Sequence, residues 1–252
     1  MQDFSDRAEK ERSQYNEGLQ RKGYERFFNH CRYFYIRKRT QLIKEKIKFA
    51  HNKKVLEIGS VTWKGWLESN SILPASLNCI NISEIELQQG IDSAFKSRAN
   101  PQFLLMDAHK LQFEDESFDF VFGAAILHHL NMVTALNEIH RVLKPNGKIL
   151  FVEPLDMNPV GEIVRSLTKK ARTVDEQPLR VCDIVEIKKR FETQFFYEEF
   201  LSVPFGVLSG MFFKDGSNSL MRFAFTADQF LDRNFEWIRN WFRHVLIDGV
   251  RK

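Results

Sequence analysis

Cysteine and long apolar runs are scarce in this sequence of 252 residues. Cys31, Cys79 and Cys182 are odd in number and far apart, which predicts reduced thiols rather than a disulfide framework or a metal site. No apolar segment follows the charged N-terminus as in a signal peptide, and no run reaches the roughly 18 apolar residues of a membrane span. These absences predict a cytoplasmic protein with no transmembrane segment.

A strong excess of one charge is also absent. The sequence has 37 basic and 33 acidic residues and a net charge of +4, with only short basic clusters such as residues 37–39 and 188–190. Binding to nucleic acid depends on neutralising phosphates, and this composition has neither a strong basic excess nor an appended basic domain. We therefore expect no nucleic-acid partner.

Glycine is missing where a phosphate-binding loop would need it. Residues 53–60, KKVLEIGS, have the pattern of a buried strand that ends in a turn at Gly59. In an open α/β sheet the ligand lies beyond the carboxyl ends of the strands, which places Glu57 at the mouth of a site. The following residues, SVTWKG, are too bulky for a dinucleotide pyrophosphate. A ligand without phosphate and an ordinary strand with a tight turn both stay open.

Strand and helix patterns alternate five times between residues 53 and 154. The strands are expected at residues 53–60, 77–82, 102–106, 118–123 and 148–152, and the helices at residues 62–69, 84–98 and 134–143. Ser83 and Glu86 have the spacing of a capping box at the start of the second helix. The alternation predicts a doubly wound, mostly parallel α/β sheet.

Polar residues stand where these strands end. Asn81 ends the second strand, where an acidic group would accept ribose hydroxyls, and its amide can accept one hydrogen bond and donate another. Asp107 ends the third strand, where a carboxylate suits an exocyclic amine such as that of adenine, although it could equally cap the next turn. His128 and His129 follow the fourth strand and Glu153 ends the fifth. These residues are expected to gather on one rim.

The adjacent histidines are candidate proton acceptors, because an imidazole titrates near neutral pH. Neighbouring side chains diverge on a regular element, so His128 and His129 are not both expected to face one site. The alternative is that one packs or caps the next helix while the other is solvated. No further ligand follows at a suitable spacing, so a zinc site is not expected.

Apolar stripes outside the alternating segment predict two appendages. Residues 1–50 have a helical stripe, with breaks at Gly18 and Gly23, and predict an N-terminal helical cap. After residue 154 we expect helices at 158–170 and 183–191, strands at 194–200 and 244–249, and a Phe-rich insertion at 201–243 that is helical near 227–241.

Phenylalanine, in contrast, is abundant, with 24 in the chain. Residues 203–213, VPFGVLSGMFF, are too few and too interrupted by proline and glycine to cross a membrane. This stretch could pack internally, cover a substrate, form a dimer contact or touch lipid. The abundance of Phe favours a small-molecule partner with apolar surface.

The segment from residue 53 to 154 resembles the class I S-adenosylmethionine-dependent methyltransferases of the small-molecule type. VLEIGS at 55–60, NISE at 81–84 and MDA at 106–108 are similar to the first three motifs of that family, and IHRVLKPNGK at 139–148 is similar to the helix and turn before the fifth strand. The resemblance implies a Rossmann-like seven-stranded sheet. Residues 51–252 would form the methyltransferase domain, residues 1–50 its cap, and residues 201–243 a substrate lid.

The resemblance also implies where S-adenosylmethionine and its product S-adenosylhomocysteine would bind. The implied contacts are Glu57, Gly59, Ser60 and Thr62 around the methionine part, Asn81 and Ile82 at the ribose, Asp107 and Ala108 at the adenine, and Ala124 near the sulfonium. This chain departs from the family where residues 60–63 replace a glycine-rich turn and Asn81 replaces an acid. An unusual cofactor conformation and a degenerate, non-catalytic member therefore stay open.

The activity implied by the resemblance is methyl transfer to an oxygen or nitrogen of a small molecule, such as a secondary metabolite, a sugar or a lipid-linked intermediate. Alignment of nucleophile, methyl carbon and sulfur matters most, and His128, His129 or Glu153 would take the proton of the nucleophile. The alternatives are aminocarboxypropyl transfer or cyclisation of the same cofactor, and a binding or scaffold protein. A homodimer is also compatible with the sequence.

Overall fold

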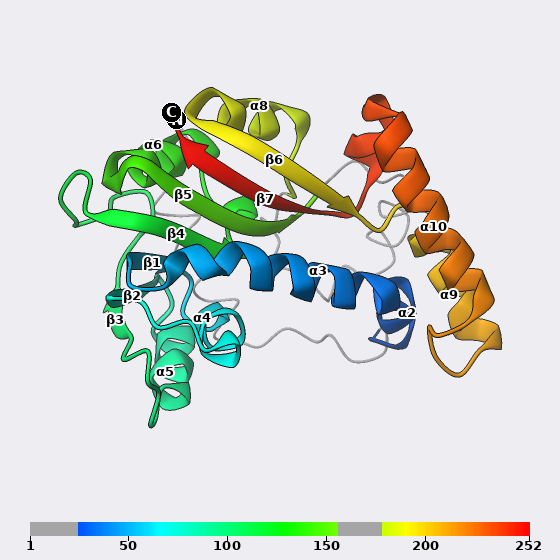
Figure 1. Cartoon of the computed structure of the whole chain (residues 1–252), viewed down its shortest axis with the longest axis horizontal. Helices are drawn as coiled ribbons and strands as arrows, with labels where there is room; N and C mark the ends of the chain where they lie inside the picture. The colour runs from blue at the N-terminus through cyan, green and yellow to red at the C-terminus, as the bar shows by residue number, and fades with distance from the viewer. Residues whose placement is uncertain (1–24, 156–177) are drawn as a thin grey trace.

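The computed structural model describes residues 25–155 and 178–252. In these residues seven strands form one sheet in the order β3-β2-β1-β4-β5-β7-β6 (Figure 1). The strands are β1 (Lys54–Ile58), β2 (Ser76–Asn81), β3 (Gln102–Leu105), β4 (Phe118–Ala124), β5 (Leu143–Pro154), β6 (Phe191–Glu198) and β7 (His244–Arg251). Among the described strands, β7 alone runs opposite to the other six, and it pairs antiparallel with β5 and β6. The predicted seven-stranded, mostly parallel sheet is confirmed.

Helices precede, connect and follow the strands. The α-helices are α2 (Glu25–Cys31), α3 (Tyr33–Lys46), α4 (Thr62–Trp66), α5 (Glu84–Ser93), α6 (Met132–Val142), α8 (Val181–Arg190), α9 (Ser202–Phe212) and α10 (Ser219–Asn234). Short 3-10 helices are η1 (Ile47–Ala50), η2 (Glu68–Asn70), η3 (Leu127–His129) and η5 (Glu236–Trp241). None of the helices in the described ranges is long and apolar enough to cross a bilayer.

Apolar side chains cover both faces of the sheet because successive residues of a strand point to opposite sides. On one face Val55 packs in a cluster that includes Trp63 of α4 and residues of α3 and η1. On the other face Leu56 packs in a cluster with Leu136 of α6 and Ile187 of α8. Burial on both faces explains why β1 and β4 read as continuous apolar runs in the sequence.

Three element boundaries differ from the sequence-based expectation. Helix α5 ends at Ser93, five residues before the expected end, and Lys96 has a φ of 63°, a left-handed conformation that a helix cannot contain. Strand β6 begins at residue 191, where a helix was expected, because α8 already ends at Arg190. The 3-10 helix η2 takes the last residues of the expected helix at 62–69.

The expected N-terminal cap is described only from residue 25 onwards. Gly18 and Gly23, like the helix expected at 158–170, lie outside the described residues. Helix α3 and the 3-10 helix η1 bury Ile43 and Ile47 against the sheet. Near the other end of α3, the Tyr35 hydroxyl donates a hydrogen bond of 3.0 Å to Asp228 of α10. The cap therefore touches both the sheet and the insertion.

The insertion at 201–243 is more helical than the sequence indicated, since α9, α10 and η5 occupy most of it. Residues 203–213 were expected to be interrupted by proline and glycine, but most of them lie in α9. A Cβ at Gly206 would overlap Cys31 of α2, and one at Gly210 would come within 2.7 Å of the Phe27 ring. The two glycines therefore allow α9 to pack closely on α2.

Candidate active site

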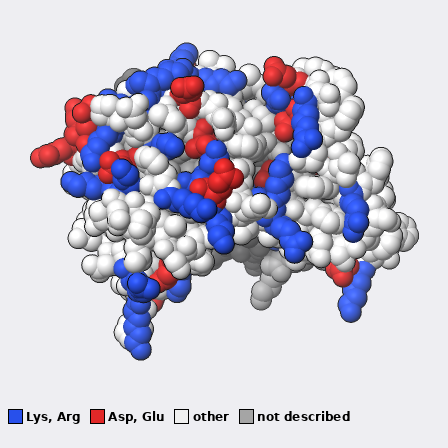
Figure 2. All heavy atoms as spheres, in the orientation of Figure 1, with Lys and Arg blue, Asp and Glu red and all other residues white. Residues whose placement is uncertain are grey.

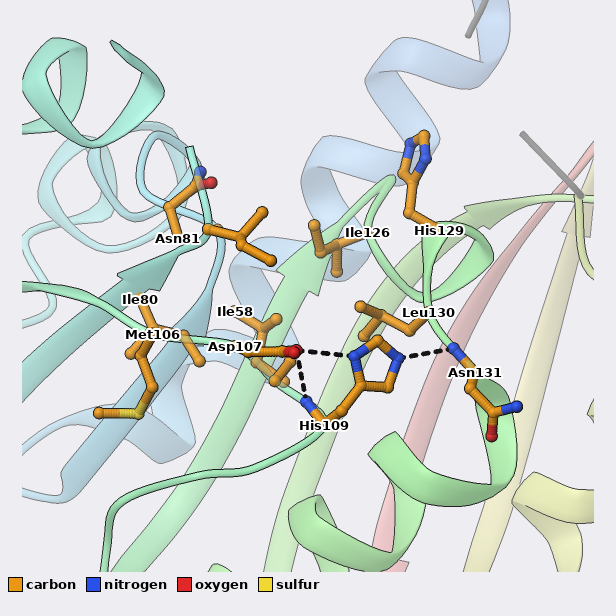
Figure 3. Close-up of a pocket in the computed structure, with 13 residues that line it drawn as sticks. Ile58, Ile80, Asn81, Met106, Asp107, His109, Ile126, His129, Leu130 and Asn131 are labelled. Carbon is orange, nitrogen blue, oxygen red and sulfur yellow. Dashed lines mark hydrogen bonds and ion pairs between the residues drawn. The ribbon is translucent and has the colours of Figure 1, made fainter. Parts of the chain in front are cut away.

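A cavity lies beyond the carboxyl ends of β1, β2 and β4 (Figure 3). It encloses about 540 Å³, including space that is open to solvent. Its apolar lining consists of Ile58, Ile80, Ile82, Met106, Ala108, Ile126 and Leu130, and its remaining lining of Gly59, Asn81, Asp107, His109, His129 and Asn131. The cavity is therefore mostly apolar, with a few polar groups that are in a position to orient a ligand.

Gly59 turns the chain at the wall of this cavity. Its φ is 114°, in the range that side chains rarely adopt, and its N–H donates a hydrogen bond of 2.8 Å to the carbonyl oxygen of Ile80. Apart from its chain neighbours, Gly59 has one heavy atom of the described residues within 4 Å of the position of a Cβ, and this is Oε1 of Glu57, at 3.7 Å. The predicted turn at Gly59 is confirmed, and a ligand can approach its backbone without meeting a side chain.

Glu57 does not lie at the mouth of the site, and that prediction is wrong. The side chain is fully buried behind the turn. Its Oε1 accepts a hydrogen bond of 2.7 Å from the Thr62 N–H, and its Oε2 accepts one of 3.2 Å from the Cys79 thiol. Burial raises the pKa of Glu57 to about 7, although these hydrogen bonds oppose the change. The carboxyl group holds the turn and the start of α4 in place.

Ser60 and Thr62 also lie behind the cavity wall. The Ser60 hydroxyl is buried and donates a hydrogen bond of 2.9 Å to the carbonyl oxygen of Glu86 in α5. Thr62 begins α4 and donates its N–H to Glu57. Neither residue is part of the lining, so both stabilise the turn from behind.

Asn81 lines the cavity but its amide is engaged within the protein. Its Oδ1 accepts a hydrogen bond of 2.9 Å from the Ser83 N–H, and its Nδ2 donates to Ser60 Oγ at 3.1 Å and to Glu86 Oε2 at 3.0 Å. The oxygen and nitrogen of the Asn81 amide, which were expected to bind a ribose, are therefore already hydrogen-bonded within the protein. The partner in this network that carries a negative charge is Glu86, which sequence reasoning treated only as a capping residue.

The capping pattern at α5 is present only in part. Ser83 Oγ accepts the Glu86 N–H at 3.3 Å, as a capping box requires. The Glu86 carboxylate does not return to the Ser83 N–H, which donates to Asn81 instead. Within the described part of the chain, Asn81 Nδ2 is the hydrogen-bond donor to this carboxylate, through Oε2.

Asp107 faces the cavity and is tied to His109, a residue that the sequence analysis missed (Figure 3). Its Oδ1 accepts the His109 N–H at 2.9 Å and lies 2.7 Å from His109 Nδ1. The Asn131 N–H donates to His109 Nε2 at 2.7 Å, which places the ring proton on Nδ1. Partial burial raises the pKa of Asp107, but the hydrogen bonds from His109 outweigh it and lower the pKa below its ordinary value. Asp107 is therefore ionised at neutral pH.

Glu153 is fully buried below the chain that follows β4. Its Oε1 accepts hydrogen bonds of 3.0 Å from the N–H groups of Ile126 and Leu127. Its Oε2 lies 2.8 Å from His128 Nδ1 and also accepts the His128 N–H at 3.4 Å. The carboxylate thus holds η3 and orients His128, and it is not part of the cavity lining.

His128 and His129 line different cavities. His129 lines the cavity that contains Asp107, whereas His128 lines a second, polar cavity together with Arg180 and Asp183. This agrees with the expectation that they do not share one site. The two rings do not diverge, however, because their centroids are only 3.9 Å apart in the tight 3-10 turn of η3.

The structure brings together part of the predicted set. Gly59, Asn81, Ile82, Asp107, Ala108 and His129 line one cavity, whereas Glu57, Ser60, Thr62, Ala124, His128 and Glu153 are not part of its lining. Ala124 ends β4 and leads to Ile126, which does line the cavity. Among the described residues, no group of three or more His, Cys, Asp or Glu side chains is arranged to hold a metal ion.

Comparisons with known proteins agree with this geometry. Residues 56–151 match a family described as methyltransferase domain. The chain is 29% identical over 116 residues to the ubiquinone/menaquinone biosynthesis C-methyltransferase of Geotalea daltonii, across 43% of this chain and 48% of that protein. It is 28% identical over 151 residues to a demethylmenaquinone methyltransferase of Staphylococcus epidermidis, across 59% of this chain and 60% of that protein.

A similar fold is found in solved structures. Geranyl diphosphate C-methyltransferase from Streptomyces coelicolor, solved with S-adenosyl-L-homocysteine, superposes with a TM-score of 0.55 at 11% identity, across 86% of this chain and 79% of that one. Its likeness supports the fold, while the matched domain covers the strands that line the cavity. The domain match over residues 56–151, the strand order and the cavity at the ends of β1 and β2 together support a class I S-adenosylmethionine-dependent methyltransferase.

Proposed function

We propose that this protein transfers a methyl group from S-adenosylmethionine to a small-molecule acceptor. The observation that carries the proposal is the apolar cavity that has the open backbone of Gly59 at its wall and the Asp107 carboxylate in its lining. Apolar walls suit a planar base, and an ionised carboxylate suits an exocyclic amine. The turn after β1 lacks the glycines that a phosphate group would need. These features fit a nucleoside cofactor without phosphate.

The residues that would hold the cofactor follow from the same contacts. Adenine would lie between Ile80 and Ile126, with its amine at Asp107, and the amino acid part would lie along the backbone at Gly59. Glu86 is not part of the cavity lining, but its carboxylate is held 3.0 Å from the amide nitrogen of Asn81, which does line the cavity. Glu86 would accept the ribose hydroxyls beside Asn81, because the Asn81 amide is already engaged. When bound, S-adenosylmethionine supplies an electrophilic methyl group on a sulfonium.

The acceptor would enter from the side of His128. The second cavity, which His128 lines, shares Leu130 and Asn131 with the first, so the two are adjacent. Glu153 Oε2 lies 2.8 Å from His128 Nδ1 and orients the ring, and His128 would take a proton from the nucleophile.

The acceptor that fits these observations has apolar surface. The C-methyltransferase of G. daltonii belongs by its name to ubiquinone and menaquinone biosynthesis, so we propose an aromatic or lipid-linked acceptor for this chain as well. Because that relative is a C-methyltransferase by name, we propose carbon as well as oxygen and nitrogen as the atom of the acceptor that is methylated. The described part of the cap, residues 25–50, and the insertion at 201–243 would form walls of the acceptor site.

Titration calorimetry with S-adenosylhomocysteine and S-adenosylmethionine tests the proposal directly. Micromolar binding of both ligands is the expected result, followed by formation of S-adenosylhomocysteine when an acceptor is added. Formation of methylthioadenosine instead would indicate transfer of the aminocarboxypropyl arm. No binding of either ligand by the folded protein would contradict the proposal and would favour a scaffold role.

Replacing Asp107 with alanine is expected to weaken S-adenosylhomocysteine binding roughly 10- to 100-fold, since a hydrogen bond to a charged group is lost. Asp107→Asn keeps an acceptor for His109 and isolates the effect of the charge. Asp92→Ala, at an exposed position of α5, is the matched control and should leave the affinity unchanged. Equal affinities for Asp107→Ala and the control would rule out a cofactor role for Asp107.

Replacing Glu86 with glutamine is expected to weaken adenosine binding roughly fivefold to tenfold and to reduce the preference for adenosine over 2′-deoxyadenosine. The amide keeps the size of the side chain but loses one of the two acceptor oxygens and the charge. Competition calorimetry against S-adenosylhomocysteine measures both ratios. Glu84→Gln, at the exposed first residue of α5, serves as the control. An unchanged adenosine preference in Glu86→Gln would assign the ribose to another group.

A further inference from the structure

Large apolar side chains are exposed together on α9, α10 and η5. The set consists of Leu208, Met211, Phe212, Phe223, Phe230 and Trp237, whose exposed fractions run from 46% to 76%. We call this set the α9–α10 face. The two helices form one side of the molecule in Figure 1, and the same side of Figure 2 is largely white, with few charged groups. Soluble surfaces rarely place so many aromatic groups together without a partner.

The part of this face on α9 follows from how the helix packs. Helix α9, Ser202–Phe212, contains no charged residue. Gly206 and Gly210 lie against α2, and Ser209 Oγ is 2.8 Å from His30 Nδ1 of the same helix. Small residues therefore occupy the inner side, and Leu208, Met211 and Phe212 remain on the outer side. This arrangement leaves the largest apolar groups of the helix in contact with solvent.

The remaining residues extend the face along α10 and η5. Phe223 and Phe230 are seven residues apart and share one side of α10, opposite the buried Ala224 and Asp228. Phe205 of α9 contacts the ring of Phe223 at a centroid distance of 5.9 Å, which joins the two helices. The aromatic surface is therefore continuous across α9 and α10.

Unpaired cations accompany this apolar surface. Lys214, Arg222 and Arg233 are exposed and form no ion pair within the described residues. The acidic residues nearby are engaged, because Arg239 pairs with both Asp232 and Glu236, at 3.1 and 2.9 Å. A further acid, Asp215, accepts hydrogen bonds from Ser217 and keeps its negative charge. Lys214, Arg222, Arg233 and Arg239 together outnumber Asp215, Asp232 and Glu236, so this surface carries a small excess of positive charge.

We propose that the α9–α10 face docks on the surface of a lipid bilayer that contains anionic headgroups. Phe, Met and Trp side chains bury favourably at the boundary between headgroups and acyl chains, and Lys and Arg reach the phosphates. A symmetric second copy of this chain is less suitable, because it would bring Lys214, Arg222 and Arg233 of both copies to the same interface. The inference goes beyond the methyl-transfer proposal and does not depend on it.

Vesicle sedimentation of the full chain tests the proposal. Vesicles of phosphatidylcholine with phosphatidylglycerol should bind the protein, and removal of the anionic lipid should weaken binding. The double variant Phe212→Ser with Phe223→Ser should lose at least about tenfold in affinity, because two apolar anchors are removed. Phe95→Ser is the matched control, since Phe95 is 80% exposed and follows the end of α5 by two residues. Helix α5 lies on the opposite side of the molecule from α9 and α10 (Figure 1).

Charge variants and fluorescence give two further measurements. Arg222→Gln and Arg233→Gln should each cost about fivefold on anionic vesicles and much less on phosphatidylcholine alone. Trp237 is 66% exposed, so vesicles should shift tryptophan emission to shorter wavelength. The double variant Trp237→Phe with Trp241→Phe should remove most of that shift, since Trp63 is buried in the core and Trp66 stacks on Phe122 of β4. Trp241 is included because it is 37% exposed and its ring lies 5.7 Å from that of Trp237.

Three results would overturn the proposal. The first is that the unaltered protein does not bind vesicles, and the second is that the Phe95 variant and the double Phe variant bind them equally. The third is that the unaltered protein is a dimer that does not bind vesicles, and that the double Phe variant is a monomer. The last result would assign the face to self-association. Unchanged urea midpoints will show that the variants are folded, and no cofactor is needed, so a failure here leaves the methyl-transfer proposal unaffected.

Discussion

Replacing Glu153 with alanine is expected to lower the free energy of unfolding by about 3 to 5 kcal/mol. The buried carboxylate accepts hydrogen bonds from the N–H groups of Ile126 and Leu127 and from His128. Alanine would leave these donors without a partner in a place that water does not reach. The loss is large because the penalty comes from several unsatisfied groups as well as from a cavity.

Urea denaturation followed by circular dichroism measures this loss. Glu192→Ala provides the control, because Glu192 is exposed on the edge strand β6. Glu153→Gln should cost less than the alanine variant, since the amide oxygen can still accept hydrogen bonds from the backbone of η3. A loss for Glu153→Ala as small as that for the control would mean that this carboxylate does not hold the chain after β4.

Replacing Glu57 with glutamine is expected to remove a pH dependence of stability. Burial raises the pKa of Glu57 from 4.5 to about 7, which corresponds to about 3 kcal/mol. The folded protein therefore holds a proton that the unfolded chain has released between these values, and stability falls as pH rises through this window. The contribution of Glu57 is fully present below pH 4.5 and is lost above pH 7.

Unfolding free energies at several pH values from 4 to 8 test this expectation. The difference between Glu57→Gln and the unaltered protein should change by about 3 kcal/mol in favour of the variant across the window. Glu45→Gln, at an exposed position of α3, should show no such change. Parallel pH profiles for the Glu57 variant and the unaltered protein would contradict the assignment.

The sheet could be predicted because its strands are buried on both faces and so form apolar runs bounded by turn residues. The insertion was harder, because Pro204, Gly206 and Gly210 look like breaks in the sequence. Pro204 lies in the first turn of α9, where its missing N–H has no helical acceptor in any case. The glycines are explained by the approach of α2, whose position a local pattern does not reveal.

The candidate site could be predicted where a residue at a strand end faces outwards, as Asn81 and Asp107 do. Glu57 and Glu153 occupy equivalent positions, yet both turn inwards and accept backbone hydrogen bonds. A carboxylate at a strand end can either face the cavity or turn inwards and accept backbone hydrogen bonds, and the sequence does not show which of the two occurs. His109 lies two residues after Asp107, but its second partner, the Asn131 N–H, comes from a distant segment that a local pattern does not reveal. Glu86 was assigned only to a capping box, and its contact with Asn81 depends on how α5 packs beside the end of β2.

The bridge through His109 has a consequence for the energetics of ligand binding. Its ring connects Asp107, after β3, with the backbone of Asn131, at the start of α6. The two segments are thereby fixed relative to each other before any ligand arrives. Ordering a loop during association costs free energy, and here folding has already met that cost. If His109 were lost, Asp107 could still contact a ligand. The empty cavity would be more mobile, however, and the ligand would bind more weakly.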